Sequence, residues 1–144
     1  MNDFENNASN GSAESELHEA AWAGDLDWVK KILEEGVDVN WKDSCGETAI
    51  FGACGWGRTD VVRYLISHGA LVNLREESGL TPLHWAASHG GLETIKVLIE
   101  AGADPGAADD EGRLPIDLAH EAGKDDRVTY LKTVGPQIQS RRSK

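Results

Sequence analysis

The chain has 144 residues and carries 25 acidic against 14 basic side chains, which gives a formal net charge of −11. This length suits a single domain with a modest core. So acidic a chain repels the phosphates of nucleic acids and the surfaces of anionic membranes. No apolar run in the sequence approaches the length of a membrane span. We therefore expect one domain that binds neither nucleic acid nor a membrane.

Residues 1–13 are polar, acidic and low in complexity, and Phe4 is their only large apolar side chain. This composition predicts a disordered N-terminal tail. The segment has no basic start and no apolar stretch, so it does not resemble a secretory signal. The two cysteines, Cys45 and Cys54, are too few for a disulfide framework and lack the paired spacing of a zinc site. Together these features predict an intracellular protein, cytoplasmic or nuclear.

The sequence repeats itself with a period of 33 residues. Three series of glycines share this spacing: Gly46, Gly79 and Gly112; Gly24, Gly57, Gly90 and Gly123; and Gly36, Gly69 and Gly102. A fixed period of this length is the mark of a repeat protein, whose units bury their apolar faces against one another. The predicted domain covers residues 14–135 in four repeats, at about 14–42, 43–75, 76–108 and 109–135. A basic C-terminal tail, 136–144, follows it.

Each repeat is predicted to form two helices. In the third repeat, Thr81 offers an N-cap oxygen and Pro82 suits the first helical position, where its missing N–H is no loss. The short helix that follows stops before Gly90. A second helix over 92–101 places apolar side chains on one face, namely Leu92, Ile95, Leu98 and Ile99. The chain is therefore predicted to be all-α.

The segments GLTPLHWAASHGGLETIKVLIEAGAD (79–104) and GETAIFGACGWGRTDVVRYLISHGALVN (46–73) resemble ankyrin repeats. The resemblance extends over residues 15–134. It implies a solenoid of about four helix-turn-helix repeats with short hairpin-like loops, of the small stand-alone type that acts by binding another protein. The first and last repeats depart from the family pattern, with Ser15 and Leu114 in the threonine position. Such departures are expected, because terminal repeats face water as caps.

His84 occupies the histidine of the family's T-P-L-H motif, which braces the repeat through hydrogen bonds to the backbone. The equivalent position in the second repeat holds Phe51, and a catalytic histidine is not interchangeable with phenylalanine. His18-Glu19 begins like a zinc-protease helix, but Trp22 stands where the second histidine is required. No set of base, nucleophile and oxyanion donor is visible. We therefore expect no catalytic residue, no cofactor and no metal, and an enzyme remains only a remote alternative.

In ankyrin folds the concave face and the loop tips usually bind the partner. Trp22 and Trp56 are the least ordinary residues mapped to this surface, because exposed tryptophan is enriched at binding hot spots. An alternative for Trp22 is burial under the N-terminal tail against Phe4. The resemblance places the following residues at the partner site: Trp22, Lys42, Ser44, Cys45, Glu47, Trp56, Arg75, Glu77, Ser78, Leu80, Ser88, His89, Asp110, Glu111 and Arg113. Trp28 is predicted to lie in the core, Trp85 to be buried or half-buried, and Trp41 to brace a turn between repeats.

Two acidic runs, Glu76-Glu77 and Asp109-Asp110-Glu111, fall in loops between repeats and are predicted to be solvated. They favour a basic partner through electrostatic steering. We thus predict a monomeric, non-catalytic protein-interaction module. The alternative is a regulatory subunit, assembly chaperone or inhibitor that masks a basic client. By resemblance, Asn40 and Asn73 are also candidates for asparaginyl hydroxylation, against the alternative that their side chains stabilise turns.

Overall fold

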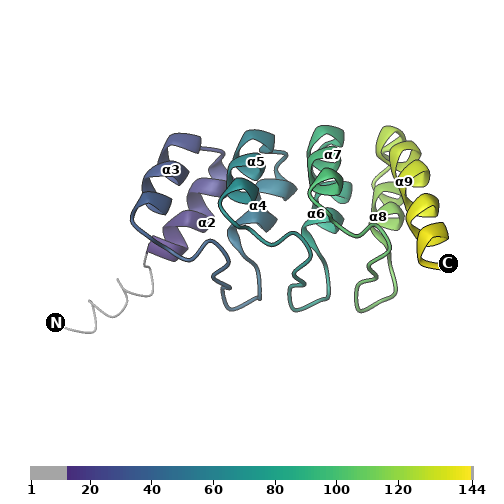
Figure 1. The fold of residues 1–144 in the computed structure, drawn as a ribbon, viewed down its shortest axis with the longest axis horizontal. Helices are drawn as coiled ribbons and strands as arrows, with labels where there is room; N and C mark the ends of the chain where they lie inside the picture. The colour runs from purple at the N-terminus through teal and green to yellow at the C-terminus, as the bar shows by residue number, and fades with distance from the viewer. Residues whose placement is uncertain (1–12, 144) are drawn as a thin grey trace.

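A computed structural model describes residues 13–143 (Figure 1), with side chains described for 13–135. This part of the chain contains eight α-helices and no strand, which confirms the predicted all-α class. The helices are α2 (Ala13–Ala23), α3 (Leu26–Glu34), α4 (Ala49–Gly55), α5 (Thr59–Ser67), α6 (Pro82–Ser88), α7 (Leu92–Glu100), α8 (Pro115–Glu121) and α9 (Asp125–Ser143). None of them is long and apolar enough to cross a membrane.

The helices form two layers along one axis (Figure 1). Helices α2, α4, α6 and α8 contact one another in sequence and make the first layer, while α3, α5, α7 and α9 make the second. The loops that connect successive repeats project together to one side of the layers. This is the stacked arrangement of helix pairs that the 33-residue period predicts.

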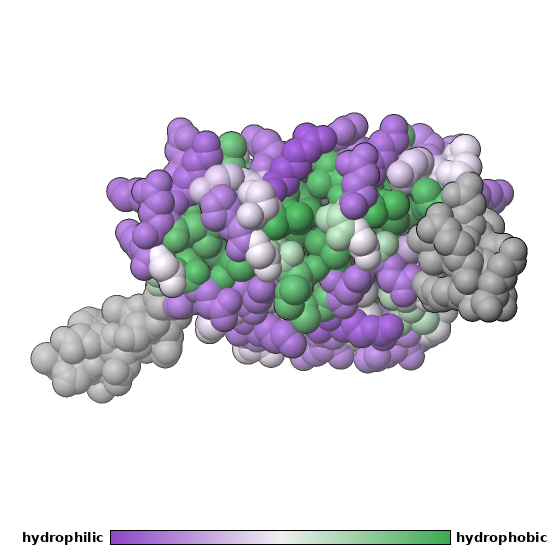
Figure 2. Space-filling view, in the orientation of Figure 1, coloured by the Kyte–Doolittle hydropathy of each residue, from purple (hydrophilic) through white to green (hydrophobic). Residues whose placement is uncertain are grey.

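One apolar core runs the length of the stack, from Leu17 to Leu131. Leu65 in α5 and Leu98 in α7 occupy equivalent positions in their repeats, and both are fully buried. Small side chains such as Ala53 allow neighbouring helices to approach closely. On the face seen in Figure 2, apolar surface forms a band across the middle of the molecule, bordered by polar side chains. Apolar residues at the margins of the core are therefore only partly buried, as in solenoids whose repeats contact only their neighbours.

Trp28 lies at such a margin. It packs against the core but remains half-buried, so the prediction that it is a core residue is wrong in degree. Trp85 is also half-buried, within the predicted range. Trp41 lies next to His18, with ring centroids 5.3 Å apart, and its carbonyl oxygen lies 3.4 Å from His18 Nε2.

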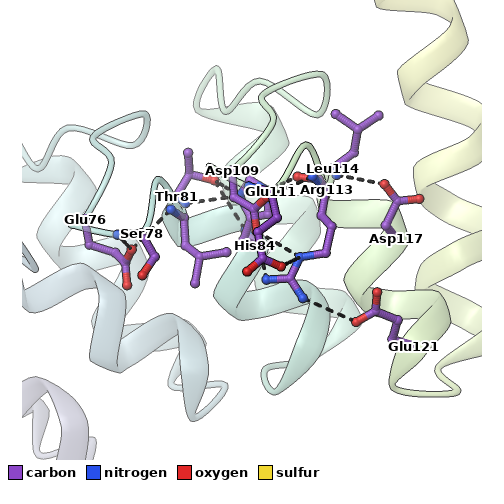
Figure 3. Close-up of polar contacts among 11 residues, drawn as sticks. Glu76, Ser78, Thr81, His84, Asp109, Glu111, Arg113, Leu114, Asp117 and Glu121 are labelled. Atoms are coloured by element: carbon purple, nitrogen blue, oxygen red, sulfur yellow. Dashed lines mark hydrogen bonds and ion pairs between the residues drawn. The ribbon is translucent and has the colours of Figure 1, made fainter.

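The T-P-L-H motif of the third repeat supplies hydrogen-bond partners for the backbone N–H groups at the start of α6 (Figure 3). The Thr81 N–H donates to Nδ1 of His84 at 3.1 Å, and the His84 N–H donates to Thr81 Oγ1 at 3.4 Å. With Nδ1 accepting, Nε2 carries the proton and donates to the carbonyl of Arg113 at 2.8 Å. His84 therefore braces the third repeat to the fourth as a neutral ring, and burial lowers its pKa below the ordinary histidine value. In the fourth repeat Asp117 takes this position and accepts from the Leu114 N–H at 2.8 Å.

Each finger loop contains a carboxylate that accepts two hydrogen bonds from its own backbone. Asp43, Glu76 and Asp109 are 33 residues apart, and each accepts from the N–H groups two and four residues further on, at 2.6–3.2 Å. A glycine with φ near +80° follows in each finger, as at Gly46. Because an L side chain is strained at such an angle, glycine is required at this turn.

Asp109 corrects the expectation that both acidic runs are solvated. Its side chain is 1% exposed and lies 2.9 Å from the guanidinium of Arg113. Burial alone would raise the pKa of Asp109, but the bonds from Arg113 and from the Glu111 N–H hold it below its ordinary value. Asp109 is therefore a buried structural carboxylate whose charge is balanced by Arg113. Glu77, Asp110 and Glu111, in contrast, are exposed.

The two ends differ from the predicted boundaries. Helix α2 begins at Ala13, one residue inside the segment predicted as the N-terminal tail, and Ala13 packs against the core. Helix α9 continues to Ser143 and so includes most of the segment predicted as the basic C-terminal tail. The alternative of a contact between Phe4 and Trp22 involves a residue outside the described part of the chain.

Candidate partner-binding surface

The two tryptophans singled out in the sequence lie side by side in the structure. Trp22, in the last turn of α2, is 55% exposed, and Trp56, the residue that ends α4, is 57% exposed. Their ring centroids are 6.2 Å apart and their planes meet at 34°. The two rings therefore form one continuous exposed aromatic surface, here called the tryptophan pair. Residues on adjacent helices make this contact, because α2 packs directly against α4.

A groove adjoins the tryptophan pair on the first helix layer. It encloses about 240 Å³ and is lined by His18, Trp22, Asp43, Glu47, Thr48, Ala49, Gly52, Trp56 and Trp85. Pockets that bury drug-sized ligands enclose about 300–1,000 Å³. The groove therefore has room for one or two side chains rather than for a whole small-molecule ligand.

The groove exists because the second repeat lacks a side chain that the third repeat has. Gly52 stands in the position that Trp85 occupies 33 residues later. The neighbouring Phe51 is fully buried and packs edge-to-face on Trp85, with ring centroids 5.9 Å apart. Phe51 thus fills the core beneath α4, while Gly52, which has no side chain, leaves space for the groove beside the tryptophan pair.

The finger end of the groove carries negative charge that nothing in the described chain neutralises fully. Glu47 is half-buried, and its carboxylate makes no hydrogen bond or ion pair with the described residues. Burial, followed by the nearby carboxylates of Asp43, Glu76 and Glu77, raises the pKa of Glu47. Within the described range, the one ion-pair partner of Asp43 is His18, whose Nδ1 lies 3.7 Å from Asp43 Oδ2 and carries charge only when the ring is protonated.

Two residues that line the groove carry a buried polar atom with no hydrogen-bond partner among the described residues: Thr48 Oγ1 and Trp85 Nε1. Thr48 is only 1% exposed. In the third repeat, the equivalent hydroxyl of Thr81 lies 2.9 Å from His84 Nδ1. Phe51, in the histidine position of the second repeat, offers no such partner. Buried polar groups without a hydrogen-bond partner are uncommon and reduce stability. The two unpaired atoms therefore show that the hydrogen bonding of the groove is incomplete within the described residues.

The remaining predicted site residues lie mainly along the fingers. The exposed ones are Lys42, Ser44, Cys45, Arg75, Glu77, Ser78, His89, Asp110 and Glu111, and the half-buried ones are Glu47, Leu80, Ser88 and Arg113. Successive fingertips are joined by backbone hydrogen bonds, from Glu77 N to Cys45 O at 3.0 Å and from Asp110 N to Ser78 O at 3.1 Å. The fingertips therefore form one continuous edge.

Arg113 is less available than predicted. Its guanidinium lies within 2.9–3.7 Å of three carboxylates, those of Asp109, Glu111 and Glu121 (Figure 3). The fourth repeat thus carries a paired ionic cluster, while the unpaired charge lies at the second repeat and the exposed aromatic rings lie where the first and second repeats meet. Sequence reasoning did not assign six of the residues that line the groove to the partner site: His18, Asp43, Thr48, Ala49, Gly52 and Trp85.

Asn40 and Asn73 connect successive repeats. Asn40 Nδ2 donates to Gly69 O at 3.0 Å and Oδ1 accepts from Leu71 N at 2.9 Å. Asn73 repeats this pattern with Gly102 O and Asp104 N. These bonds support the interpretation that both side chains stabilise turns. Hydroxylation at these positions stays a prediction.

The fold defines a class of protein: a stack of helical repeats. Within that class, the chain belongs to the ankyrin-repeat family, because the model for ankyrin repeats (3 copies) matches residues 17–109. Proteins of this kind act in general by binding other proteins rather than by catalysis. Among the described residues, no group of three or more metal-ligating side chains is found.

Three similar proteins each match less than a third of the chain. A probable E3 ubiquitin-protein ligase, XBOS33, from Oryza sativa is 50% identical over 44 residues, which are 31% of this chain and 8% of the relative. Osteoclast-stimulating factor 1 from Gallus gallus is 44% identical over 43 residues, 30% of this chain and 21% of the relative. The same protein from Mus musculus gives 44% over 43 residues, 30% and 20%. The chain thus matches at most about a fifth of the length of these relatives.

Proposed function

We propose that this chain is a non-catalytic interaction module whose partner protein docks on the tryptophan pair and the adjoining groove. The observation that carries the proposal is the pairing of Trp22 and Trp56, two large rings that remain more than half exposed while touching each other. Tryptophan is enriched among residues that dominate binding energy, especially at the centre of an interface beside a pocket. The groove provides such a pocket.

The partner is proposed to be basic. The chain carries a net charge of −11, and Glu77, Asp110 and Glu111 are exposed along the fingertip edge. Such a surface speeds the approach of a basic protein, and the effect falls with salt because exposed charges are screened. The acidic run at 109–111 attracts a basic partner less strongly than the sequence suggests, because Arg113 balances the charge of Asp109 within the same loop. The module is proposed to act inside the cell, in keeping with its two free cysteines.

The experiment compares Trp56→Ala with Leu71→Ala. Both residues are large, apolar and exposed, at 57% and 53%, but Leu71 does not line the groove. A partner is first purified with the wild-type chain from its native source and is then titrated calorimetrically against each variant. We expect Trp56→Ala to weaken binding by about 2 kcal/mol or more and Leu71→Ala to leave it nearly unchanged. Equal affinity of the wild type and Trp56→Ala would refute the proposed surface.

A further inference from the structure

We propose that the groove beside the tryptophan pair receives one arginine side chain from an extended segment of the partner. This inference rests on the proposed function and specifies the chemistry of the docked group. The groove combines three features that match an arginine: a carboxylate end, aromatic walls and an unpaired polar floor. The first layer of helices provides the walls, and the finger of the second repeat provides the carboxylates.

The carboxylate end would hold the guanidinium. Glu47 lines the groove, is half-buried and has no cationic partner in the described chain. Asp43 lines it as well, and its Oδ2 is not used by the backbone hydrogen bonds of the finger, which both end on Oδ1. A guanidinium has five N–H donors in a fixed plane and bonds carboxylates in a bidentate fashion. A cation at this position would also relieve the mutual repulsion of Asp43 and Glu47.

The aromatic walls would hold the stem of the side chain. Trp22 and Trp56 line the same groove as the carboxylates. Arginine buries its methylene stem on apolar surface while its charged end remains polar, and its planar head stacks on aromatic faces. Lysine has a rounder, more strongly hydrated head and gains less from stacking. The two rings are already in contact with each other, so the stem lies along the pair rather than between the rings.

The polar floor is an independent indication of a ligand. The Thr48 side chain is almost fully buried, lines the groove and has no partner for Oγ1. It can accept a hydrogen bond from the guanidinium. Trp85 Nε1 is a donor without an acceptor, and a backbone carbonyl of an extended segment can supply one. In the proposed complex, one arginine-bearing segment supplies a hydrogen-bond partner to each of these two groove-lining side chains.

The charges around the groove select against anions. No lysine or arginine lines it. Arg58 lies in the neighbouring shallow hollow, together with Glu19 and the tryptophan pair, and its Nε donates to the Trp22 carbonyl at 3.2 Å. An extended segment that crosses the tryptophan pair would thus meet the carboxylates of Asp43 and Glu47 on one side. On the other side it would meet Glu19 and Arg58, which carry opposite charges.

The test uses three acetylated and amidated five-residue peptides that carry arginine, citrulline or lysine at the centre and alanine elsewhere. Citrulline keeps the shape of arginine but is neutral. Each peptide is titrated into the full-length chain, and the five indole N–H signals are followed by NMR. We expect the arginine peptide to shift the signals of Trp22, Trp56 and Trp85 but not that of Trp28, and to bind about tenfold more tightly than the citrulline peptide. Lysine should bind more weakly than arginine.

Glu47→Gln should abolish the difference between arginine and citrulline. Glu100→Gln, which removes one exposed carboxylate at the end of α7, is the matched control and should preserve the difference. Equal binding of the arginine and citrulline peptides, or of the arginine and lysine peptides, overturns the proposal. So does an arginine preference that survives Glu47→Gln. These results leave the proposed function standing if Trp56→Ala still loses the partner, so the two failures are distinguishable.

Discussion

The second and third repeats have the same backbone plan and use it differently. In the third, His84 ties Thr81 to the backbone of the fourth repeat. In the second, Phe51 replaces the histidine and is buried, while the hydroxyl of Thr48 has no partner within the part of the chain that the structure describes. Next to it, Gly52 leaves open the space that a tryptophan takes one repeat later. A repeat can therefore lack the hydrogen bonds of the histidine position, retain its apolar core and have a surface groove where a large side chain is missing.

If this comparison is right, the cores of the two repeats should be equivalent even though their surfaces differ. Leu65→Ala and Leu98→Ala remove the same fully buried side chain from α5 and α7. Each should lower the free energy of unfolding by about 2–5 kcal/mol, through lost burial and the cavity that remains. Urea unfolding followed by circular dichroism measures both. A loss at one position only would show that the repeats do not share one cooperative core.

Of the second and third repeats, only the third should depend on polar bracing by the residue in the histidine position. His84→Phe copies the second repeat and leaves the Thr81 N–H and the Arg113 carbonyl without their partner. We expect a loss of about 1–3 kcal/mol, the cost of unpaired buried polar groups. Thermal unfolding of the variant beside the wild type tests this. An unchanged melting temperature would mean that Phe is as good as His at this position, and the contrast between the repeats would fail.

The same pair of proteins gives a pH test. Burial lowers the pKa of His84 in the folded state, so the unfolded state takes up the proton first as the pH falls. The contribution of His84 to stability is therefore complete above the ordinary histidine pKa of about 6.5 and declines below it, down to the lowered folded pKa. Between about pH 7 and 5, the wild type should lose more stability than His84→Phe. Parallel curves would argue against a buried neutral ring.

The sequence predicted most of the fold because its signals were local and periodic. Thr81 and Pro82 set the start of α6 as expected, and the glycine period gave the turns. It also predicted that Trp22 and Trp56 would be exposed, but not that their rings touch. That contact depends on how α2 leans on α4, and the two residues are not equivalent in their repeats.

Two features of the site were missed for different reasons. The groove is created by an absent side chain at Gly52, and a missing group leaves no motif in the sequence. The acidic run around Asp109 predicts a solvated side chain, but the structure buries it. The 33-residue steps from Asp43 to Glu76 and from Glu76 to Asp109 carried the correct information, since a carboxylate recurring at the repeat period indicates a structural role in the finger.

A smaller effect should separate two glycines of α4. At Gly52 an added Cβ would lie 3.6 Å from the Cβ of Trp22, an ordinary contact, so Gly52→Ala should stabilise the chain by about 0.5–1 kcal/mol. It should also narrow the groove and weaken the arginine peptide. At Gly55 the added atom would lie 2.8 Å from Trp85 Cε3, so Gly55→Ala should destabilise. Melting and peptide titration of both variants test this. Stabilisation by Gly52→Ala with unchanged peptide affinity would contradict the role of the groove.

The smallest effect concerns the two thiols of the second repeat, which report on its core and its finger without altering stability. Cys54 is fully buried, and burial raises the pKa of its thiol. Cys45 is exposed at the fingertip, where the charge of Glu77 is the main cause of a raised pKa. Because the thiolate is the reactive form, neutral iodoacetamide should alkylate Cys45 more slowly than a cysteine in a short peptide, and Glu77→Gln should speed it. Cys54 should react only when the chain unfolds. Mass spectrometry of timed samples measures both rates, and equal alkylation of Cys45 and Cys54 in the folded chain would show that α4 is less tightly packed than its buried face indicates.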